Sequence, residues 1–220
     1  MKFPSAAKGM KRIFSAEILQ LVGVICLIFA VALLISGVAA DKVSNGSDEG
    51  LAILGAGFLG SLILGLAFTV LYTIAFIMHL VGIINARHDE DSFSSALIFL
   101  IISVVFSCLS MCFVQKSISS IFVSVSSLAS TISTIFVIVG GVKLADRLNR
   151  GDVSTKGANV LKLIIAIGLI SCIVSIVSTF TGSIFASVTS IILIIVVLVL
   201  DIIKYILYLS FLAKAKKMLA

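Results

Sequence analysis

The feature that most constrains this chain is a series of apolar runs, each long enough to cross a lipid bilayer. A transmembrane helix needs about 20 consecutive apolar residues, and such runs recur along most of the 220 residues. Hydrophobic residues make up 60% of the sequence and charged residues 12%, whereas soluble proteins average about half and about a quarter. The runs therefore predict an integral membrane protein without a separate water-soluble domain.

Six apolar runs can be delimited, and each predicts one membrane-spanning helix. The second run is too long for one perpendicular crossing, so it must tilt, kink or protrude. We expect the whole chain, residues 1–220, to form a single membrane domain. Its fold class is an all-α bundle of six transmembrane helices, with approximate bounds 13–40, 51–85, 93–114, 119–142, 157–180 and 184–212.

The distribution of basic residues predicts the orientation of this bundle in the membrane. Of the 16 Lys and Arg residues, 14 lie at or near the two termini and the connections after the second and fourth runs. Only Lys42 and Lys116 fall on the other side. Because Lys and Arg concentrate in cytoplasmic segments, we expect both termini in the cytoplasm (N-in/C-in). A count of five or seven helices would break this alternation.

The amino end permits two interpretations. A basic start, an apolar run and Val38-Ala39-Ala40 before Asp41 fit a cleaved secretory signal. The apolar part is longer than the 7 to 15 residues usual for a signal, which favours an uncleaved first helix.

The six helices divide into three hairpins that each begin and end on the cytoplasmic side. Lys8-Gly9 precedes the first helix much as Lys156-Gly157 precedes the fifth. Duplication of a hairpin and independent convergence of helix ends on small and basic residues both explain this similarity, and both interpretations stay open.

Small residues at helical spacing predict close packing between helices. Such residues let two helix backbones approach each other within a membrane. In the first run they recur every seven positions, which places them on one stripe of the helix. The stripes are Ala16, Gly23, Ala30 and Gly37 in the first run, Gly57, Ser61, Gly65 and Thr69 in the second, and Ala96, Ser103, Ser107 and Ser110 in the third.

The fourth run carries the most polar stripe, formed by hydroxyl side chains. Their spacing alternates between four and three residues, as on one helical face. Such a stripe either lines a hydrated path or packs, with its hydroxyls bonding to their own helix or to a neighbour; the small-residue stripes elsewhere favour packing. The residues are Ser120, Ser124, Ser127, Thr131 and Thr134.

Five ionisable residues inside or near the apolar runs predict a polar layer in the inner leaflet. Ionisable groups are costly in a membrane, so each indicates a partner or a function. Asp201 and Lys204, three residues apart, can pair on one helical face. The simpler alternative is side chains that reach the interface, which the neighbouring Tyr205 and Tyr208 favour. The candidate residues are Glu17, His79, Lys162, Asp201 and Lys204.

No pattern of residues indicates catalysis. The acidic loop His88-Asp89-Glu90-Asp91 is interpreted as a solvated turn in preference to a divalent-cation site. No phosphate-binding, zinc-protease or nucleophile-elbow motif occurs. The four cysteines lie in apolar runs, where they act as small hydrophobes. We therefore expect no enzyme, no metal and no cofactor.

The sequence leaves two classes of function. The favoured one is a structural or interaction (accessory) membrane protein, and the alternative is a small transporter or channel that uses the polar layer and the hydroxyl stripe. Expected partners are the bilayer, anionic headgroups at the basic ends, and a membrane protein or a second copy, but not nucleic acid. The basic amino end and the helical hairpins rich in Ile, Val, Ser and Gly resemble those of small bacterial inner-membrane proteins, which implies a multi-pass protein of the bacterial plasma membrane.

Overall fold

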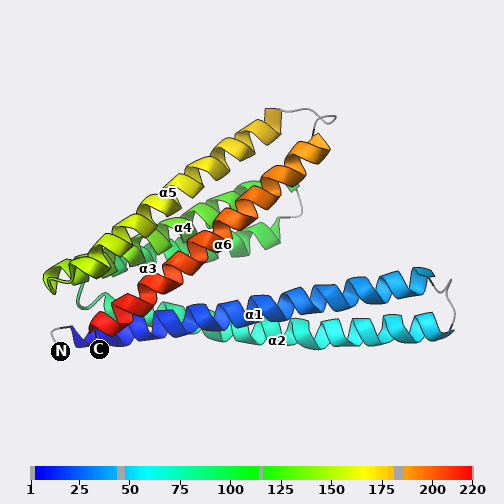
Figure 1. Ribbon diagram of the computed structural model, residues 1–220, viewed down its shortest axis with the longest axis horizontal. Helices are drawn as coiled ribbons and strands as arrows, with labels where there is room; N and C mark the ends of the chain where they lie inside the picture. Colours follow the sequence, from blue (N-terminus) through cyan, green and yellow to red (C-terminus); the bar gives the residue numbers. More distant parts are fainter. Residues whose placement is uncertain (1–2, 44–47, 114–115, 181–185, 220) are drawn as a thin grey trace. The chain divides into compact units, whose positions relative to one another are not determined.

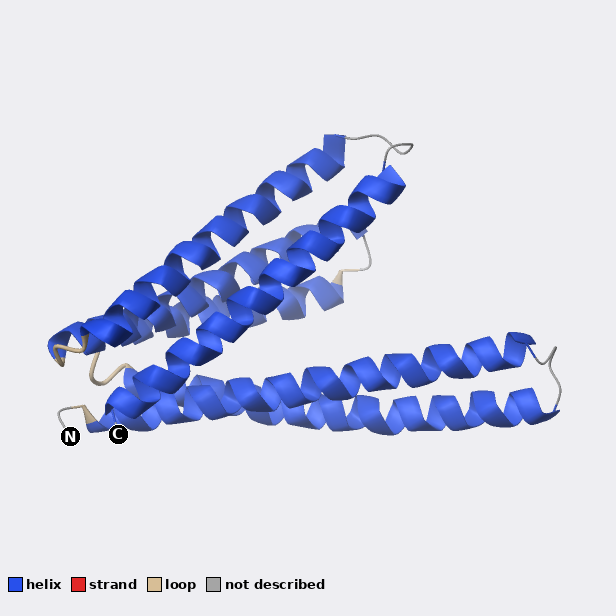
Figure 2. Cartoon of the chain, viewed as in Figure 1, coloured by secondary structure: helices blue, strands red, loops and turns tan. Residues whose placement is uncertain are grey.

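The computed structural model is all-helical over the residues that it describes, as Figure 1 and Figure 2 show. The backbone is described at residues 3–43, 48–113, 116–180 and 186–219, and the side chains at these positions except 41–43, 48–51, 116–117, 120 and 169–198. The six helices are α1 (Pro4–Val43), α2 (Asp48–Ala86), α3 (Ser92–Cys112), α4 (Lys116–Arg147), α5 (Gly151–Phe180) and α6 (Ala186–Leu219). The predicted all-α class is confirmed.

Within the part of the chain that is described, four helices are long and apolar enough to cross a membrane. At 1.5 Å per residue, α3 is about 32 Å long, close to the thickness of a bilayer's hydrocarbon core. By the same measure α1 and α2 are each about 60 Å long, so both exceed one perpendicular crossing. The four spans are Pro4–Ala40, Ala52–Ala86, Ser92–Cys112 and Ile121–Arg147.

The helices are longer than the apolar runs, most clearly around the connection expected at 143–156. There α4 continues to Arg147 and α5 begins at Gly151. The turn between them is a Schellman motif, in which the Arg150 N–H donates to the carbonyl of Ala145 and Asn149 adopts a φ of 53°. Polar residues do not by themselves end a helix, whereas a residue whose backbone adopts the left-handed helical conformation does. The connection is therefore far shorter than the polar composition predicts.

The chain folds as two compact units. The hairpin unit comprises Arg12–Val81, which is most of α1 and α2. The four-helix unit comprises Met1–Lys11 and Gly82–Ala220, which includes the first turns of α1, the end of α2, and α3 to α6. The expectation that residues 1–220 form a single membrane domain stays a prediction.

In the hairpin unit, α1 packs on α2 through the predicted small-residue stripe of α1. Ala16, Gly23, Ala30 and Gly37 are all buried. A methyl group added at Gly57 of α2 would lie 2.8 Å from the carbonyl oxygen of Leu33. The two backbones therefore touch at this point, as small residues allow. The rest of the stripe predicted on α2 does not pack in the same way, because a methyl group at Gly65 would meet no atom within 4 Å.

In the four-helix unit, α3 packs on α4, α4 on α5, and α5 on α6. The first turns of α1 and the last turns of α6 lie at one end of this unit (Figure 1). Large aromatic side chains fill the space beside glycines there. The fully buried ring of Phe93 lies against Gly140, and that of Phe211 lies between Gly141 and Gly157. Met10 of α1 also reaches Gly141. The first turns of α1 and the last turns of α6 therefore share one packed core with α3, α4 and α5.

We predict that Gly157→Ala destabilises the protein. A methyl group there would overlap Val142 Cγ2 and lie 2.7 Å from Phe211 Cε2, and overpacking a core costs about 1 to 3 kcal/mol. Thermal unfolding of the detergent-solubilised chain measures the effect. Gly168→Ala on the same helix is the matched control: no atom of the described residues lies within 4 Å of the added methyl, and alanine favours the helix. Equal melting temperatures for the two variants would contradict the close packing of Phe211.

Candidate functional site

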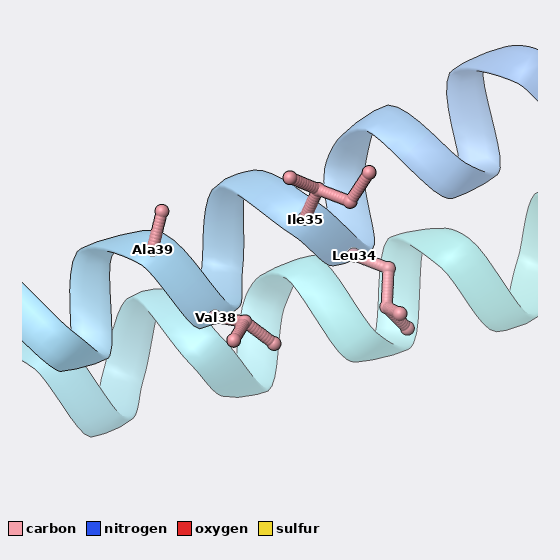
Figure 3. Close-up of a pocket in the computed structure, with 4 residues that line it drawn as sticks. All are labelled: Leu34, Ile35, Val38 and Ala39. Atoms are coloured by element: carbon pink, nitrogen blue, oxygen red, sulfur yellow. The ribbon is translucent and has the colours of Figure 1, made fainter. Parts of the chain in front are cut away.

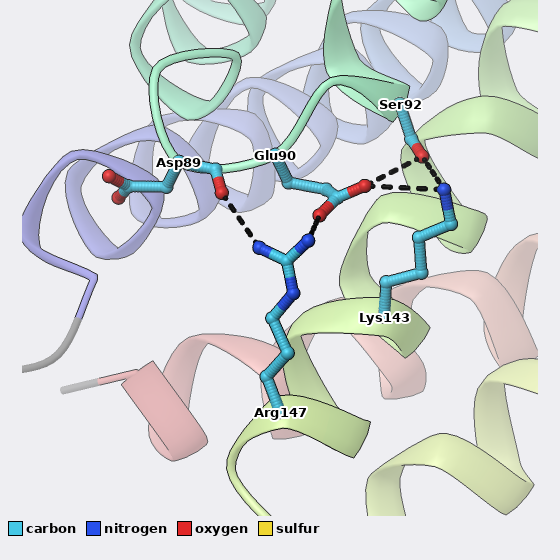
Figure 4. Close-up of polar contacts among 5 residues, drawn as sticks. All are labelled: Asp89, Glu90, Ser92, Lys143 and Arg147. Carbon is cyan, nitrogen blue, oxygen red and sulfur yellow. Dashed lines mark hydrogen bonds and ion pairs between the residues drawn. The ribbon is translucent and has the colours of Figure 1, made fainter.

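The most concentrated set of polar contacts surrounds Glu90, in the connection between α2 and α3 (Figure 4). Its side chain is only 3% exposed. Lys143 Nζ lies 3.3 Å from Oε1, and Arg147 Nη2 lies 2.7 Å from Oε2. The Ser92 hydroxyl donates to Oε1 at 3.1 Å and accepts from Lys143 at 2.9 Å. One buried carboxylate thus joins the α2–α3 connection to two cations on successive turns of α4.

The balance of forces on Glu90 favours its charged form. Burial acts to raise the pKa of this carboxyl. Hydrogen bonds from Lys143 and Ser92 and the positive charges of Arg147 and Lys143 outweigh that effect, so the pKa lies below its ordinary value of 4.5. The cations themselves remain half exposed, at 53% each. The cluster is therefore a structural ion pair network at neutral pH.

Asp89, the residue before Glu90, holds the amino end of α1. Its Oδ2 accepts a hydrogen bond of 2.6 Å from the backbone N–H of Ala6. The first turn of α1 has no acidic residue of its own, so Asp89 supplies the negative charge that stabilises a helix N-terminus. Arg147 Nη1 also donates to the Asp89 carbonyl at 3.3 Å.

The interpretation of His88–Asp91 as a solvated acidic turn is wrong for Asp89 and Glu90, which are bonded within the fold. A signal for this arrangement was present in the sequence. Lys143 and Arg147 are four residues apart, so they share one face at the end of α4, on the side predicted to hold the acidic loop. Among the described residues, no three His, Cys, Asp or Glu side chains gather as metal ligands.

Serine hydroxyls form a regular seam between α3 and α4. Ser119, Ser126 and Ser133 are seven residues apart on α4, and each donates to a carbonyl oxygen of α3. The acceptors are also seven apart and run in the opposite direction, as expected for antiparallel helices. The bonds join Ser119 to Ser110 at 3.1 Å, Ser126 to Ser103 at 2.8 Å, and Ser133 to Ala96 at 2.8 Å.

The seam uses a different face of α4 from the predicted hydroxyl stripe. Thr131 and Thr134 bond back to carbonyls of their own helix, and Ser124 and Ser127 are exposed. The side chain of Ser120 lies outside the described residues. On α3, by contrast, Ala96, Ser103 and Ser110 belong to the predicted stripe. Both faces of α4 carry hydroxyls at helical spacing, so the face that packs depends on α3 and not on α4 alone.

The five predicted residues of the inner-leaflet polar layer form two pairs and one exposed side chain. In the four-helix unit, Lys204 Nζ lies 2.5 Å from Asp201 Oδ1, and the Asp201 side chain is 50% exposed. Lys162 is exposed. In the hairpin unit, His79 Nδ1 lies 3.3 Å from Oε1 of the buried Glu17. Whether these groups form one layer stays a prediction.

A hollow on α1 is lined, among the described residues, by the aliphatic side chains of Leu34, Ile35, Val38 and Ala39 (Figure 3). None of these groups can hold a metal, donate a proton or attack a substrate. The hollow is therefore an uneven part of an apolar helix surface.

Comparisons with protein family models, with curated proteins and with solved structures find no match for this chain. Its function is therefore inferred from its own residues and geometry.

We predict that Glu90→Gln lowers stability by about 1.5 to 3 kcal/mol, the usual contribution of a hydrogen bond to a charged group. The exposed Asp152 bonds to Arg150 at 3.2 Å, so Asp152→Asn is the matched control and should change the melting temperature little.

The same variant gives a test by pH. Because the pKa of Glu90 is lowered by folding, its contribution to stability is present above the ordinary value of 4.5 and is lost as the pH falls through the lowered pKa. The difference in melting temperature between wild type and Glu90→Gln should therefore shrink on acidification. A difference that stays constant down to strongly acidic pH would contradict the ion pair network.

Proposed function

We propose that this chain is a multi-pass protein of a bacterial plasma membrane, with six spans and both termini in the cytoplasm, and that it acts as a structural or interaction (accessory) protein. In this view its polar side chains hold the helices together, and its apolar surface contacts lipid and another membrane component.

The arrangement of the four-helix unit supports an even number of spans. Asp89 bonds to the first turns of α1, and both Met10 and Phe211 contact Gly141 of α4. The amino end, the α2–α3 connection, the end of α4 and the last turns of α6 thus share one end of the unit. That end carries most of the basic residues, which favours the cytoplasmic side.

The observation that carries the proposed role is the hydroxyl seam between α3 and α4. A hydrated path needs polar groups that face water, whereas Ser119, Ser126 and Ser133 donate to the backbone of the adjacent helix. Hydroxyls used in this way stabilise helix association in a membrane. The seam therefore supports packing and not conduction.

The ionisable pairs are the observation that favours the alternative, a small transporter or channel. Glu17 with His79, and Asp201 with Lys204, fall within helices that are long and largely apolar. Intramembrane acids and histidines are common in proton and ion pathways. A flux assay separates the two functions.

We predict that Ser133→Ala lowers stability by about 1 kcal/mol, since it removes one buried hydrogen bond. Ser127→Ala, on the exposed face of the same helix, is the matched control and should be nearly neutral. Thermal unfolding in detergent measures both.

In proteoliposomes, wild type should pass protons, Na⁺, K⁺ and Cl⁻ no faster than empty vesicles. A flux that Ser133→Ala or Asp201→Asn abolishes would overturn the accessory role and establish the transporter.

A further inference from the structure

At the end of the four-helix unit that holds both termini, most acidic side chains are already bonded to other residues of the unit. Glu90 is neutralised by Lys143 and Arg147, and Asp89 bonds to the Ala6 N–H. A hydrogen bond from Arg150 lowers the pKa of Asp152. These acids therefore cannot neutralise other basic residues at the same end.

Four basic side chains at this end are exposed, and no other described residue bonds to them. Lys8 lies on the first turns of α1, Arg87 directly follows α2, and Lys214 and Lys217 lie on the last turns of α6. Against them, two exposed acids, Asp91 and Asp146, are found nearby in sequence. The exposed charge of these segments is thus predominantly positive.

Backbone packing draws the three segments together. A methyl group added at Gly9 would lie 2.5 Å from the Gly82 carbonyl oxygen and 2.8 Å from the Ala86 nitrogen. The two backbones therefore touch directly beside Lys8 and Arg87. Met10 and Phe211 meet at Gly141, which places the last turns of α6 beside the same segment. The segments that carry the four basic residues thus lie at one end of the unit. Lys8, Arg87, Lys214 and Lys217 are here called the basic end.

We propose that the basic end binds the anionic headgroups of the bilayer in which the helices lie. Lys and Arg donate to phosphate oxygens, and each one near an anionic membrane surface contributes an affinity factor of about five. Lys8 lies on a helix that is long and apolar enough to cross a membrane, and Arg87 directly follows another. The surface that the basic end reaches first is therefore that of the membrane itself. This inference rests on the proposed membrane location and adds a lipid preference to it.

The experiment titrates the full-length, detergent-solubilised protein with short-chain phosphatidylglycerol or phosphatidylcholine and follows binding by thermophoresis. Wild type should bind the anionic lipid more tightly, and added salt should weaken that binding. The variant Lys8→Gln/Arg87→Gln/Lys214→Gln/Lys217→Gln should lose at least about tenfold in affinity for the anionic lipid, toward the value for phosphatidylcholine.

The matched control is Lys162→Gln, which removes an exposed basic residue outside the basic end and should bind as wild type does. Equal affinity of wild type for the two lipids, or an unchanged affinity in the fourfold variant, would overturn the proposal. Displacement of the lipid by inorganic phosphate would also overturn it, because the site would then take free anions.

Failure of the lipid preference is distinguishable from failure of the proposed membrane role. If the fourfold variant remains in carbonate-washed membranes and keeps the wild-type melting temperature, its lipid affinity tests the headgroup preference alone, because the protein is still folded and in the membrane. Loss of wild type from washed membranes would instead remove the proposed function.

Discussion

A buried carboxylate must be neutralised, and the neutralisation of Glu90 organises one end of this protein. Lys143 and Arg147 reach it from α4, so the α2–α3 connection cannot leave α4 without exposing or stranding a charge. Asp89, one residue earlier, bonds to the amino end of α1. Two consecutive acids therefore tie two segments that are distant in sequence, the amino end of α1 and the end of α4, to a single connection. The packing of Phe93 and Phe211 on glycines lies at the same end.

Away from that end, polar groups also serve the association of helices. The seam of Ser119, Ser126 and Ser133 repeats one bond every two turns of α4, and the glycines of α1 and α2 bring two backbones into contact. Large aliphatic side chains face outward along the described helices. Such a surface suits lipid tails or the apolar face of another membrane protein. The chemistry of the described residues thus supports the proposed accessory role.

The helical class and the small-residue stripe of α1 could be predicted because length and hydrophobic content require helices in a bilayer, and because spacing alone places residues on one face. The ends of the helices could not, since Asn149 stops α4 by its backbone conformation and not by polarity. Glu90 was missed because a charged loop is usually solvated, and only the tertiary approach of Lys143 and Arg147 buries it. The packing face of α4 was missed for a similar reason: Ser127 and Thr134 have the same seven-residue spacing as Ser126 and Ser133, and the partner helix decides which of the two pairs packs.

In the proposed accessory protein, the serine hydroxyls of the seam lie between α3 and α4. The most direct test is to measure whether water reaches the seam. Ser126→Cys and Ser133→Cys would be placed in a chain whose native cysteines are replaced, and membrane vesicles of both orientations would be treated with a membrane-impermeant maleimide. Neither cysteine should be modified until the protein is unfolded, whereas the cysteine of Asp152→Cys, at the exposed start of α5, should be modified from one side. Modification of the seam cysteines as rapid as that of Asp152→Cys would show a hydrated path between α3 and α4 and would contradict the account.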